Sequence, residues 1–294
     1  MNGDTSIPHF HKYQALGNDY LVIDPSEFPL DPAPDRVRAI CDRNRGAGSD
    51  GILLGPLTDP GGSAAPFVRI FNPDGSEAEK SGNGVRIFAR YLVDKGFAGN
   101  AAFPLLTKGG PVSARLVDAE AGLFEIDMGA ASFSAASHGL FWEGGQFVNE
   151  PLSVGGETFT ATFVSMGNPH CVIIVRCATR EIAERYGPLV ERHPMFPERT
   201  NVQFMEILDR DSVKIEIWER GAGYTLASGS SSCAAASAAR RLGLVDDEVR
   251  VFMPGGFLDI EMSDDRVLMT GPVRNVFEGR FSPDFLRGIG MEGV

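Results

Sequence analysis

Ser81-Gly82-Asn83-Gly84 and Ser228-Gly229-Ser230-Ser231 are two related turns, and each opens a stretch with helical character. These stretches run from Val85 to Lys95 and from Cys233 to Leu242. The first N–H groups of a helix have no partner within it, and the helix dipole favours negative charge there. Glycine beside the serine lets a ligand approach the backbone, so each turn is a candidate carboxylate site. The simpler interpretation is that both serines are ordinary N-caps, a position that serine prefers.

The two turns lie at matching places in a longer repeat. In each half, a Gly-Asn turn after an apolar residue is followed by a strand-like run, a glycine turn and the serine turn. These segments are Leu16–Asp19, Val68–Phe71 and Asp74-Gly75 in the first half, and Met166–Pro169, Val213–Trp218 and Arg220-Gly221 in the second. The offset is 150 residues from Gly17 to Gly167 and 147 from Ser81 to Ser228. We therefore predict a duplicated unit whose two helix N-termini face each other across a cleft, each carrying a hydroxyl.

The composition narrows the class of protein. With 294 residues, 43% of them hydrophobic, the chain is long enough for two domains with full cores. The net charge of −12 and the lack of a Lys/Arg cluster argue against a nucleic-acid partner. No apolar run is long enough to span a membrane, and the N-terminus lacks a signal-peptide pattern. We therefore expect a cytoplasmic protein without a membrane or nucleic-acid partner.

Neither a metal nor an organic cofactor is indicated by the motifs. The four cysteines, Cys41, Cys171, Cys177 and Cys233, form no CxxC pair, and no His/Asp/Glu spacing suggests a metal site. No GxGxxG or P-loop motif is present. Cys171 and Cys177 lie in or beside an apolar run, so we expect buried thiols, as in a reducing cytoplasm.

Short strand patterns dominate the chain, with few helices. Pro34–Arg43 and Arg180–Arg192 are helix candidates at corresponding places in the two halves. Ala234–Ala239 is small and apolar on nearly every face, which is typical of a buried helix with close neighbours. We predict an α/β (α+β) fold of two pseudo-symmetric domains, each a curved mixed sheet wrapped around a central helix. The seam is expected near Met128–Ser134, where the chain becomes rich in Gly, Ala and Ser.

Polar side chains suited to a small ligand gather in the turns. Five asparagines lie in turns or at strand ends, where asparagine is also common for local reasons: Asn18, Asn72, Asn83, Asn168 and Asn201. Arg220 is suited to grip a carboxylate through two parallel hydrogen bonds, and a surface pair with Glu219 is the alternative. His170 is a candidate proton shuttle, and a structural histidine is the alternative.

Taken together, these residues resemble the diaminopimelate epimerase family over essentially the whole chain. The first-half markers are Ala15-Leu-Gly-Asn-Asp19, Cys41-Asp-Arg43, Gly46-Ala-Gly-Ser-Asp-Gly51, Phe71-Asn-Pro-Asp-Gly-Ser-Glu77 and Ser81-Gly-Asn-Gly84. The second-half markers are Met166-Gly-Asn-Pro-His170, Asn201-Val-Gln-Phe204, Glu219-Arg-Gly-Ala-Gly223 and Met269-Thr-Gly-Pro272. The resemblance implies domains at 1–131 with 272–294 and at 132–271, an active site between them, and a homodimer.

The family inverts an amino-acid α-carbon without a cofactor, and its reaction converts LL- into meso-diaminopimelate in lysine biosynthesis. Two thiols flank the α-carbon; one removes the proton and the other delivers a proton to the opposite face. Carried over by position, the reacting end of the substrate is held by Asn18, Gly82, Asn83, Glu219, Gly229 and Ser230. The distal amino-acid end is held by Asn72, Asn168, Asn201 and Arg220. His170 and Glu219 match family residues near the reacting carbon.

The chain departs from the family at both bases, because Ser81 and Ser228 stand where the family has cysteine. A thiol has a pKa of about 8.5, whereas a serine hydroxyl is a far weaker acid. Because a general base works best with a pKa near the working pH, we expect two-base epimerisation to be severely impaired. Tyr224 replaces the usual glutamate, and Gly51 stands where some family members have glutamine.

Three explanations fit this pattern of kept binding residues and lost bases. The chain is an epimerase with both thiols replaced by engineering, or a natural relative that catalyses another isomerisation or an elimination, which Tyr224 favours. The third explanation is a binding protein that senses or sequesters an amino acid. The first two share the fold and the substrate class, with Ser81, Ser228, His170 and Glu219 at the catalytic positions.

Overall fold

The computed structural model describes residues 8–291, which fall into two compact units. Unit 1 comprises Met1–Ile126 and Pro272–Val294, and unit 2 comprises Asp127–Gly271. The first boundary therefore lies slightly before the expected one at 131/132, at the end of a strand rather than in the Gly/Ala/Ser-rich stretch. The closing segment, from Pro272 onward, belongs to unit 1.

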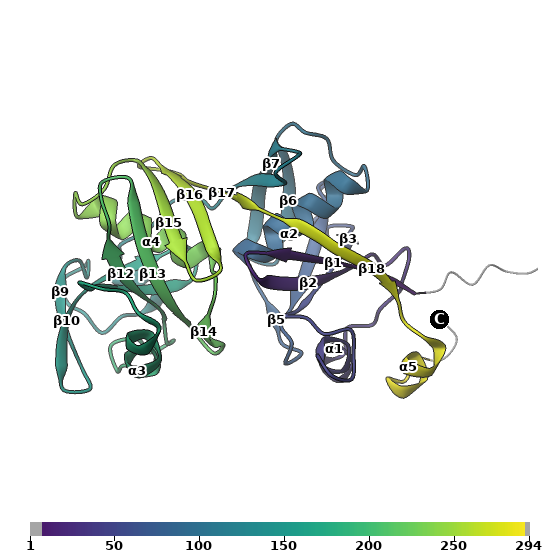
Figure 1. The fold of residues 1–294 in the computed structure, drawn as a ribbon, viewed down its shortest axis with the longest axis horizontal. Helices are drawn as coiled ribbons and strands as arrows, with labels where there is room; N and C mark the ends of the chain where they lie inside the picture. Colours follow the sequence, from purple (N-terminus) through teal and green to yellow (C-terminus); the bar gives the residue numbers. More distant parts are fainter. Residues whose placement is uncertain (1–7, 292–294) are drawn as a thin grey trace, which may run out of the picture. The chain divides into compact units, whose positions relative to one another are not determined.

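Unit 1 is a mixed sheet against which helix α2 (Gly82–Asp94) packs (Figure 1). Its strands are β1 (His9–Ala15), β2 (Asn18–Ile23), β3 (Ile52–Leu57), β4 (Phe67–Phe71), β5 (Glu77–Ala78), β6 (Phe103–Thr107), β7 (Gly110–Asp118), β8 (Leu123–Asp127) and β18 (Arg274–Arg280). Neighbours follow the order β18–β1–β2–β3–β4–β6–β7–β8, and β5 adds to β4. Only β2–β3 and β4–β6 are parallel pairs in this order.

Unit 2 is a second mixed sheet, against which helix α4 (Gly229–Arg241) packs. Its strands are β9 (Glu150–Val154), β10 (Glu157–Ser165), β11 (Pro169–Ile174), β12 (Asn201–Ile207), β13 (Ser212–Glu219), β14 (Gly223–Thr225), β15 (Glu248–Met253), β16 (Gly256–Met262) and β17 (Val267–Pro272). Neighbours follow the order β9–β10–β11–β12–β13–β15–β16–β17, and β14 adds to β13. Here the parallel pairs are β11–β12 and β13–β15.

The two units have closely similar sheets, because their strand orders carry the same succession of parallel and antiparallel pairs. They differ in one edge strand, which is the closing β18 in unit 1 and the opening β9 in unit 2. Helix α1 (Pro34–Cys41) joins β2 to β3, and α3 (Arg180–Glu191) joins β11 to β12 in the same way. Helix α2 leads into β6, which is parallel to β4, and α4 leads into β15, which is parallel to β13. Unit 1 also holds the short α5 (Pro283–Gly288), and unit 2 a 3-10 turn, η1 (Ala135–His138). The predicted α+β fold is therefore confirmed, with the duplication expressed as a repeated sheet and central helix.

Both central helices begin directly after the serines, earlier than the apolar pattern indicates. Helix α2 begins at Gly82 and α4 at Gly229, with Ser81 and Ser228 as their N-cap residues. Glycine, asparagine and serine in a first helical turn carry no apolar period, so the pattern detects these helices only from their second turn. The small-residue stretch Ala234–Ala239 is buried, as expected for a helix with close neighbours.

One expectation about the cysteines is wrong. Cys171 lies in β11 and is fully buried, whereas Cys177 is exposed. Strand β11 ends at Ile174, so Cys177 falls in the loop that leads to α3, outside the apolar run.

The packing of α3 against the sheet of unit 2 predicts an effect on stability. Replacing a helical glycine by alanine ordinarily stabilises a helix by about 0.5–1 kcal/mol. A Cβ at Gly187 would lie 2.6 Å from both Cβ and Cγ of Trp218. The Trp218 ring is held by its Nε1–H, which donates to Glu191 at 2.8 Å. We therefore expect Gly187→Ala to lower the free energy of unfolding by about 1–3 kcal/mol in urea titrations.

Gly288→Ala in α5 is the matched control, because a Cβ there would meet nothing within 4 Å. This control is expected to leave the urea midpoint unchanged or to raise it slightly, because the added methyl group meets no neighbour. Unchanged or raised stability of Gly187→Ala would contradict the packing described for α3.

Candidate active site

The start of α2 is the first part of the candidate site, and its serine hydroxyl is held in place. Ser81 has extended backbone angles, and its Oγ accepts a hydrogen bond from Gly84 N at 3.1 Å. The same Oγ lies 3.3 Å from the hydroxyl of Tyr20. Gly82, the first residue of the helix, is buried and presents no side chain. This geometry satisfies the plain N-cap interpretation and also places a hydroxyl where the helix dipole favours negative charge.

Two predicted substrate-binding asparagines contact each other beside this helix start. Asn83 Nδ2 donates to Asn18 Oδ1 at 3.1 Å, and Asn18 Nδ2 donates to Asp50 Oδ2 at 2.9 Å. Arg86, which is fully buried, donates to Asn83 Oδ1 at 2.9 Å. The Gly-Asn turn is therefore fastened to the first turn of α2 through side-chain amides.

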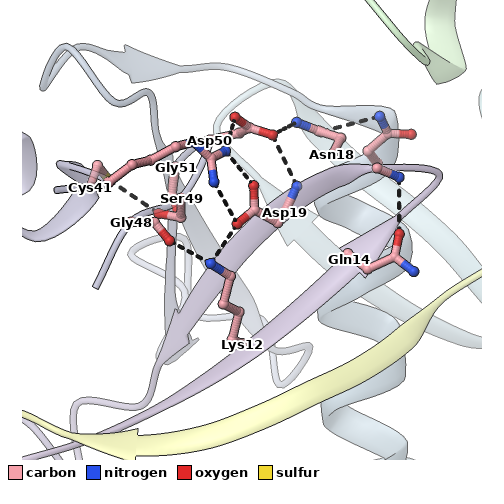
Figure 2. A network of polar contacts seen from close by, with 12 residues as sticks. Lys12, Gln14, Asn18, Asp19, Cys41, Gly48, Ser49, Asp50 and Gly51 are labelled. Atoms are coloured by element: carbon pink, nitrogen blue, oxygen red, sulfur yellow. Dashed lines mark hydrogen bonds and ion pairs between the residues drawn. The ribbon is translucent and has the colours of Figure 1, made fainter. Parts of the chain in front are cut away.

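Beyond Asn18, this chain of contacts ends in a cluster of charged residues that the sequence analysis missed (Figure 2). Asp19 accepts a hydrogen bond from Arg43 at 2.6 Å and pairs with Lys12 at 2.8 Å. Arg43 also donates to Asp50 at 2.6 Å. Burial alone would raise the pKa of Asp19, but the hydrogen bonds from Arg43 and Lys12 outweigh it and lower the pKa. The only sequence clue was that Asp19, Arg43 and Asp50 lie in three of the family-like segments, whereas Lys12 lies in none of them.

Asn72, expected at the distal end of the substrate, stabilises its own turn. Its Nδ2 donates to Ser76 Oγ at 3.0 Å, and its backbone N–H donates to Ser76 O at 2.8 Å. Gly75 N donates back to Asn72 O at 3.0 Å and has φ of +89°, which glycine adopts without strain. The structure does not link Asn72 to the Asn18–Asn83 pair by a hydrogen bond.

The start of α4 in unit 2 has the same backbone but a different side-chain arrangement. Ser228 has extended angles like those of Ser81, yet its side chain makes no capping hydrogen bond. The carbonyl of Ser228 accepts from Ser232 Oγ at 2.9 Å. Ser228 is 4% exposed, Gly229 is buried, and Ser230 is half-buried in the first turn. The Ser228 hydroxyl is therefore not committed to its own helix, unlike that of Ser81.

His170 lies in a fully buried chain of polar side chains that leads to α4. Its Nε2 lies 3.0 Å from Asn168 Oδ1, and its Nδ1 lies 3.1 Å from Gln203 Nε2. Gln203 Nε2 also donates to Ser231 Oγ at 2.9 Å, in the first turn of α4. Burial, with a further contribution from the positive charge of Arg220, lowers the pKa of His170 to about 3. The imidazole is therefore neutral near pH 7 and acts there through its hydrogen bonds.

Asn201 joins β12 to the turn that carries Arg220. Asn201 Nδ2 donates to Pro169 O at 3.0 Å, and its Oδ1 accepts from Arg220 N at 3.0 Å. The guanidinium of Arg220 donates to the carbonyl of Glu198 at 3.1 Å. Within residues 8–291 it has no carboxylate partner, so the expected surface pair with Glu219 does not form. Arg220 is exposed and positioned to receive an anion.

The side chains of Glu219 and Tyr224 lie on opposite faces of the β13–β14 hairpin. Glu219 follows Trp218 in β13, so its side chain leaves the strand on the other face. Tyr224 pairs across the hairpin with Trp218, and the guanidinium of Arg180 from α3 lies 4.7 Å from its ring. Tyr224 Oη donates to Glu216 at 2.7 Å, and burial followed by this bond raises its pKa to about 12. Tyr224 is thus a packing residue under α3 and a poor base.

Each helix start carries a serine hydroxyl, and each unit adds side-chain amides; unit 2 also has the exposed Arg220, which has no carboxylate partner within residues 8–291. Among residues 8–291, no group of three or more His, Cys, Asp and Glu side chains is arranged to hold a metal ion. In the same range, no helix has the length and apolar character needed to cross a membrane.

The repeated mixed sheet with a central helix is a fold that isomerases of known structure share. Among solved structures, a hydroxyproline epimerase from Agrobacterium vitis matches 98% of this chain and 96% of its own, with a TM-score of 0.68 and 15% identity. This similarity shows the fold. The sequence profile of the diaminopimelate epimerase family matches residues 10–134 and 162–276. The chain belongs to the diaminopimelate epimerase family, and it is an enzyme of the isomerase class.

Two relatives place the chain within this family at high coverage. Diaminopimelate epimerase 2 of Nostoc sp. is 48% identical over 276 residues, which span 94% of this chain and 96% of the relative. The diaminopimelate epimerase of Moorella thermoacetica is 41% identical over 94% of this chain and 100% of its own length. The resemblance stated from the sequence is confirmed by these matches.

The low pKa of His170 predicts how stability depends on pH. The unfolded chain takes up a proton near the ordinary histidine pKa of about 6.5, whereas the folded chain does so only near 3. Between these values the unfolded state binds more protons, so the free energy of unfolding falls as the pH drops from about 6.5 towards 3. We expect the imidazole NMR shifts of His170 to stay constant from pH 8 to about pH 4.5. A midpoint near 6.5 for this ring would contradict the prediction.

Proposed function

We propose that the protein binds diaminopimelate, or a closely related diamino diacid, and acts at its α-carbon without a cofactor. Family membership supports the substrate class, because the relatives matched over nearly their full length are diaminopimelate epimerases. The observation that carries the proposal is the pair of buried helix starts, each with a serine N-cap and a glycine as first helical residue. Residues of both units take part: Asn18, Gly82, Asn83, Glu219, Gly229 and Ser230 bind the reacting end, and Asn72, Asn168, Asn201 and Arg220 bind the distal end.

Ser81 and Ser228 occupy the positions of the two proton-transferring groups in this proposal. A neutral hydroxyl is a weak acid and a weak base near pH 7, so the rate of inversion is low compared with that of a thiol pair. His170 does not make up the difference, because burial lowers its pKa to about 3. Glu219 is the remaining carboxylate proposed near the reacting carbon.

The proposal includes a cytoplasmic location, independence from pyridoxal phosphate and assembly as a homodimer. The resemblance to the family supports all three. In unit 1, β18 pairs with β1 and leaves Val276 52% and Phe277 44% exposed, an apolar surface compatible with a second copy. Sedimentation velocity at micromolar protein tests the dimer, and a monomer at all concentrations would exclude it.

Restoring both thiols tests the proposed chemistry directly. We expect Ser81→Cys combined with Ser228→Cys to raise the conversion of LL- into meso-diaminopimelate by at least 10²-fold over the unmodified protein. The reason is that each helix start then carries a group whose pKa of about 8.5 lies near the working pH. Chiral chromatography of the product after incubation in heavy water measures both inversion and proton exchange.

The single variants and the unmodified chain are the controls for this experiment. Each single variant has one thiol and is expected to invert far more slowly than the double variant. If the double variant binds diaminopimelate but never inverts it, the proposed assignment of the two serines is wrong. If the unmodified chain instead turns over another amino acid, the alternative of a natural relative with a different reaction is favoured.

The guanidinium of Arg220, which has no carboxylate partner within residues 8–291, predicts which end of the ligand it recognises. We expect Arg220→Ala to weaken diaminopimelate binding by about 10²-fold, because its charge-assisted pair with the distal carboxylate is lost, and to leave lysine binding nearly unchanged, because lysine has no distal carboxylate. Isothermal titration with both ligands measures this difference.

Arg287→Ala in α5 is the control, because Arg287 is paired with the exposed Asp284 in its own helix. Equal losses of affinity for both ligands in Arg220→Ala would contradict a distal-carboxylate role for Arg220.

A further inference from the structure

Tyr20 places a phenol hydroxyl beside the serine of unit 1. Tyr20 is the third residue of β2, is 5% exposed, and lies on a strand that contacts α2. Its Oη is 3.3 Å from Ser81 Oγ, and either oxygen can be the donor. Ser81 Oγ also accepts from Gly84 N, so a negative charge on this oxygen would keep a backbone donor. Hydrogen bonds in a site without substrate are often long and shorten when the substrate is bound.

Gly51 is the reason that the Tyr20 ring fits there. Gly51 lies just before β3, and its carbonyl accepts from Leu21 N at 3.1 Å. A Cβ at position 51 would lie 2.6 Å from Tyr20 Cε1 and 2.4 Å from the carbonyl oxygen of Phe71. Any side chain larger than hydrogen would therefore displace the ring from its place beside Ser81.

The repeat makes Tyr20 the counterpart of His170. Both follow their Gly-Asn turn by the same spacing, and both lie on the strand that forms the first parallel pair of their sheet. The two rings have different partners: Tyr20 reaches the N-cap serine, whereas His170 reaches Gln203 and, through it, Ser231. In unit 1 an ionisable phenol therefore contacts the N-cap serine. In unit 2 the corresponding ring is a neutral imidazole that contacts Gln203 instead.

We propose that Tyr20 and Ser81 form a hydroxyl pair that relays protons between the phenol and the substrate α-carbon. The inference rests on the proposed function of the site. In one direction, Ser81 Oγ takes the α-proton while its own proton passes to the Tyr20 phenolate, which leaves a substrate carbanion, a neutral serine and a neutral phenol. In the other direction, Ser81 gives its proton to the carbanion, and Tyr20 returns a proton to Ser81. Because Tyr20 acts through Ser81, it is a positioning residue that also stores the proton.

The relay needs no free alkoxide, because the phenol is the more acidic of the two hydroxyls, with a reference pKa of about 10. Charged and titratable residues stand on the elements that carry or border Tyr20: Asp19 next to it in β2, Tyr13 opposite it in β1, Asp50 one residue before Gly51, and Lys80 and Arg86 before and within α2, the helix that β2 contacts. Asp19 pairs with Lys12 and Arg43, and Asp50 with Arg43. All of these neighbours stay the same when only the Tyr20 hydroxyl is removed.

Tyr20→Phe removes the hydroxyl and keeps the ring, and the first measurement is solvent deuterium entering the α-position of diaminopimelate. With the unmodified protein we expect exchange to rise about tenfold per pH unit between pH 7 and 9, as the phenolate fraction does at any pH well below the pKa of a phenol. In Tyr20→Phe we expect the rate at pH 9 to fall at least 30-fold and the slope to be lost. In a Ser81→Cys background we expect Tyr20→Phe to lower the exchange rate by less than threefold, because a thiol ionises near the working pH without help from the phenol.

Tyr13→Phe is the matched control, since Tyr13 is a buried tyrosine paired with Tyr20 across the strands, and its hydroxyl bonds to Asp94 instead. It is expected to keep the wild-type rate and slope. Wild-type exchange and slope in Tyr20→Phe would overturn the relay. An equal loss of exchange rate in Tyr20→Phe, whether position 81 is serine or cysteine, would also overturn the relay, because it would show that Tyr20 has a structural role only.

A second measurement separates the relay from the proposed substrate. In Ser81→Cys, the pKa of the new thiol is read from the pH dependence of its alkylation by iodoacetamide, using mass spectrometry of the peptide that contains residue 81. The exposed Cys177 serves as an internal reference. If Tyr20 hydrogen-bonds to the atom at this position, Tyr20→Phe raises that thiol pKa by about one unit and leaves Cys177 unchanged.

The two measurements fail in different ways. If no variant exchanges the α-proton of diaminopimelate but Tyr20→Phe still raises the thiol pKa at position 81, the proposed substrate is refuted and the Tyr20–Ser81 pair is supported. An unchanged thiol pKa at position 81 in Tyr20→Phe would overturn the pair whatever the substrate is.

Discussion

Each unit is built around the buried start of a helix whose first N–H groups have no partner within the helix. Polar groups buried without partners cost free energy, so the surrounding strands must supply partners or leave the place to a ligand. In unit 1 the Ser81 side chain accepts from Gly84 N, and the contact between Asn18 and Asn83 connects the Gly-Asn turn to the first turn of α2. In unit 2 the Ser228 side chain makes no capping hydrogen bond, and Gln203 donates to the Ser231 hydroxyl in the first turn of α4.

The same topology therefore carries two different electrostatic arrangements. The network of unit 1 is charged and internally paired, with Asp19 held ionised by Arg43 and Lys12. The network of unit 2 is buried and neutral, because burial suppresses protonation of His170. Its charged group, Arg220, remains without a carboxylate partner among the described residues, and the Ser228 hydroxyl makes no bond to its own helix. An anionic ligand therefore gains most from unit 2, while unit 1 offers a hydroxyl already held in position.

Much of the fold was predictable because it depends on patterns that are local in sequence. The repeated Gly-Asn and serine turns indicated the duplication, and the featureless stretch Ala234–Ala239 indicated a buried helix. The first turns of α2 and α4 escaped prediction, since their Gly, Asn and Ser residues have no apolar period. Cys177 was misplaced because a single apolar run does not show where its strand ends.

The sequence named the asparagines and serines of the candidate site but not the contacts that hold them, and their role in binding a substrate stays a prediction. Asp50 and Gln203 meet their partners only through the parallel pairs β2–β3 and β11–β12, which join segments far apart in the chain. The resemblance supplied roles for Asn72 and Asn201, whereas the structure adds that each also supports the backbone of a turn. Long-range register of this kind is not encoded in any short motif.

The hydroxyl at position 81 does not stand alone in this structure. The Tyr20 ring reaches Ser81 only because Gly51 leaves room for it, so these three residues form one matched group. Tyr224 is matched in the same way to Glu216 and Arg180, which hold it under α3. Both groups depend on several residues at once: the phenol–serine contact needs the glycine at position 51, and the place of Tyr224 needs Glu216 and Arg180.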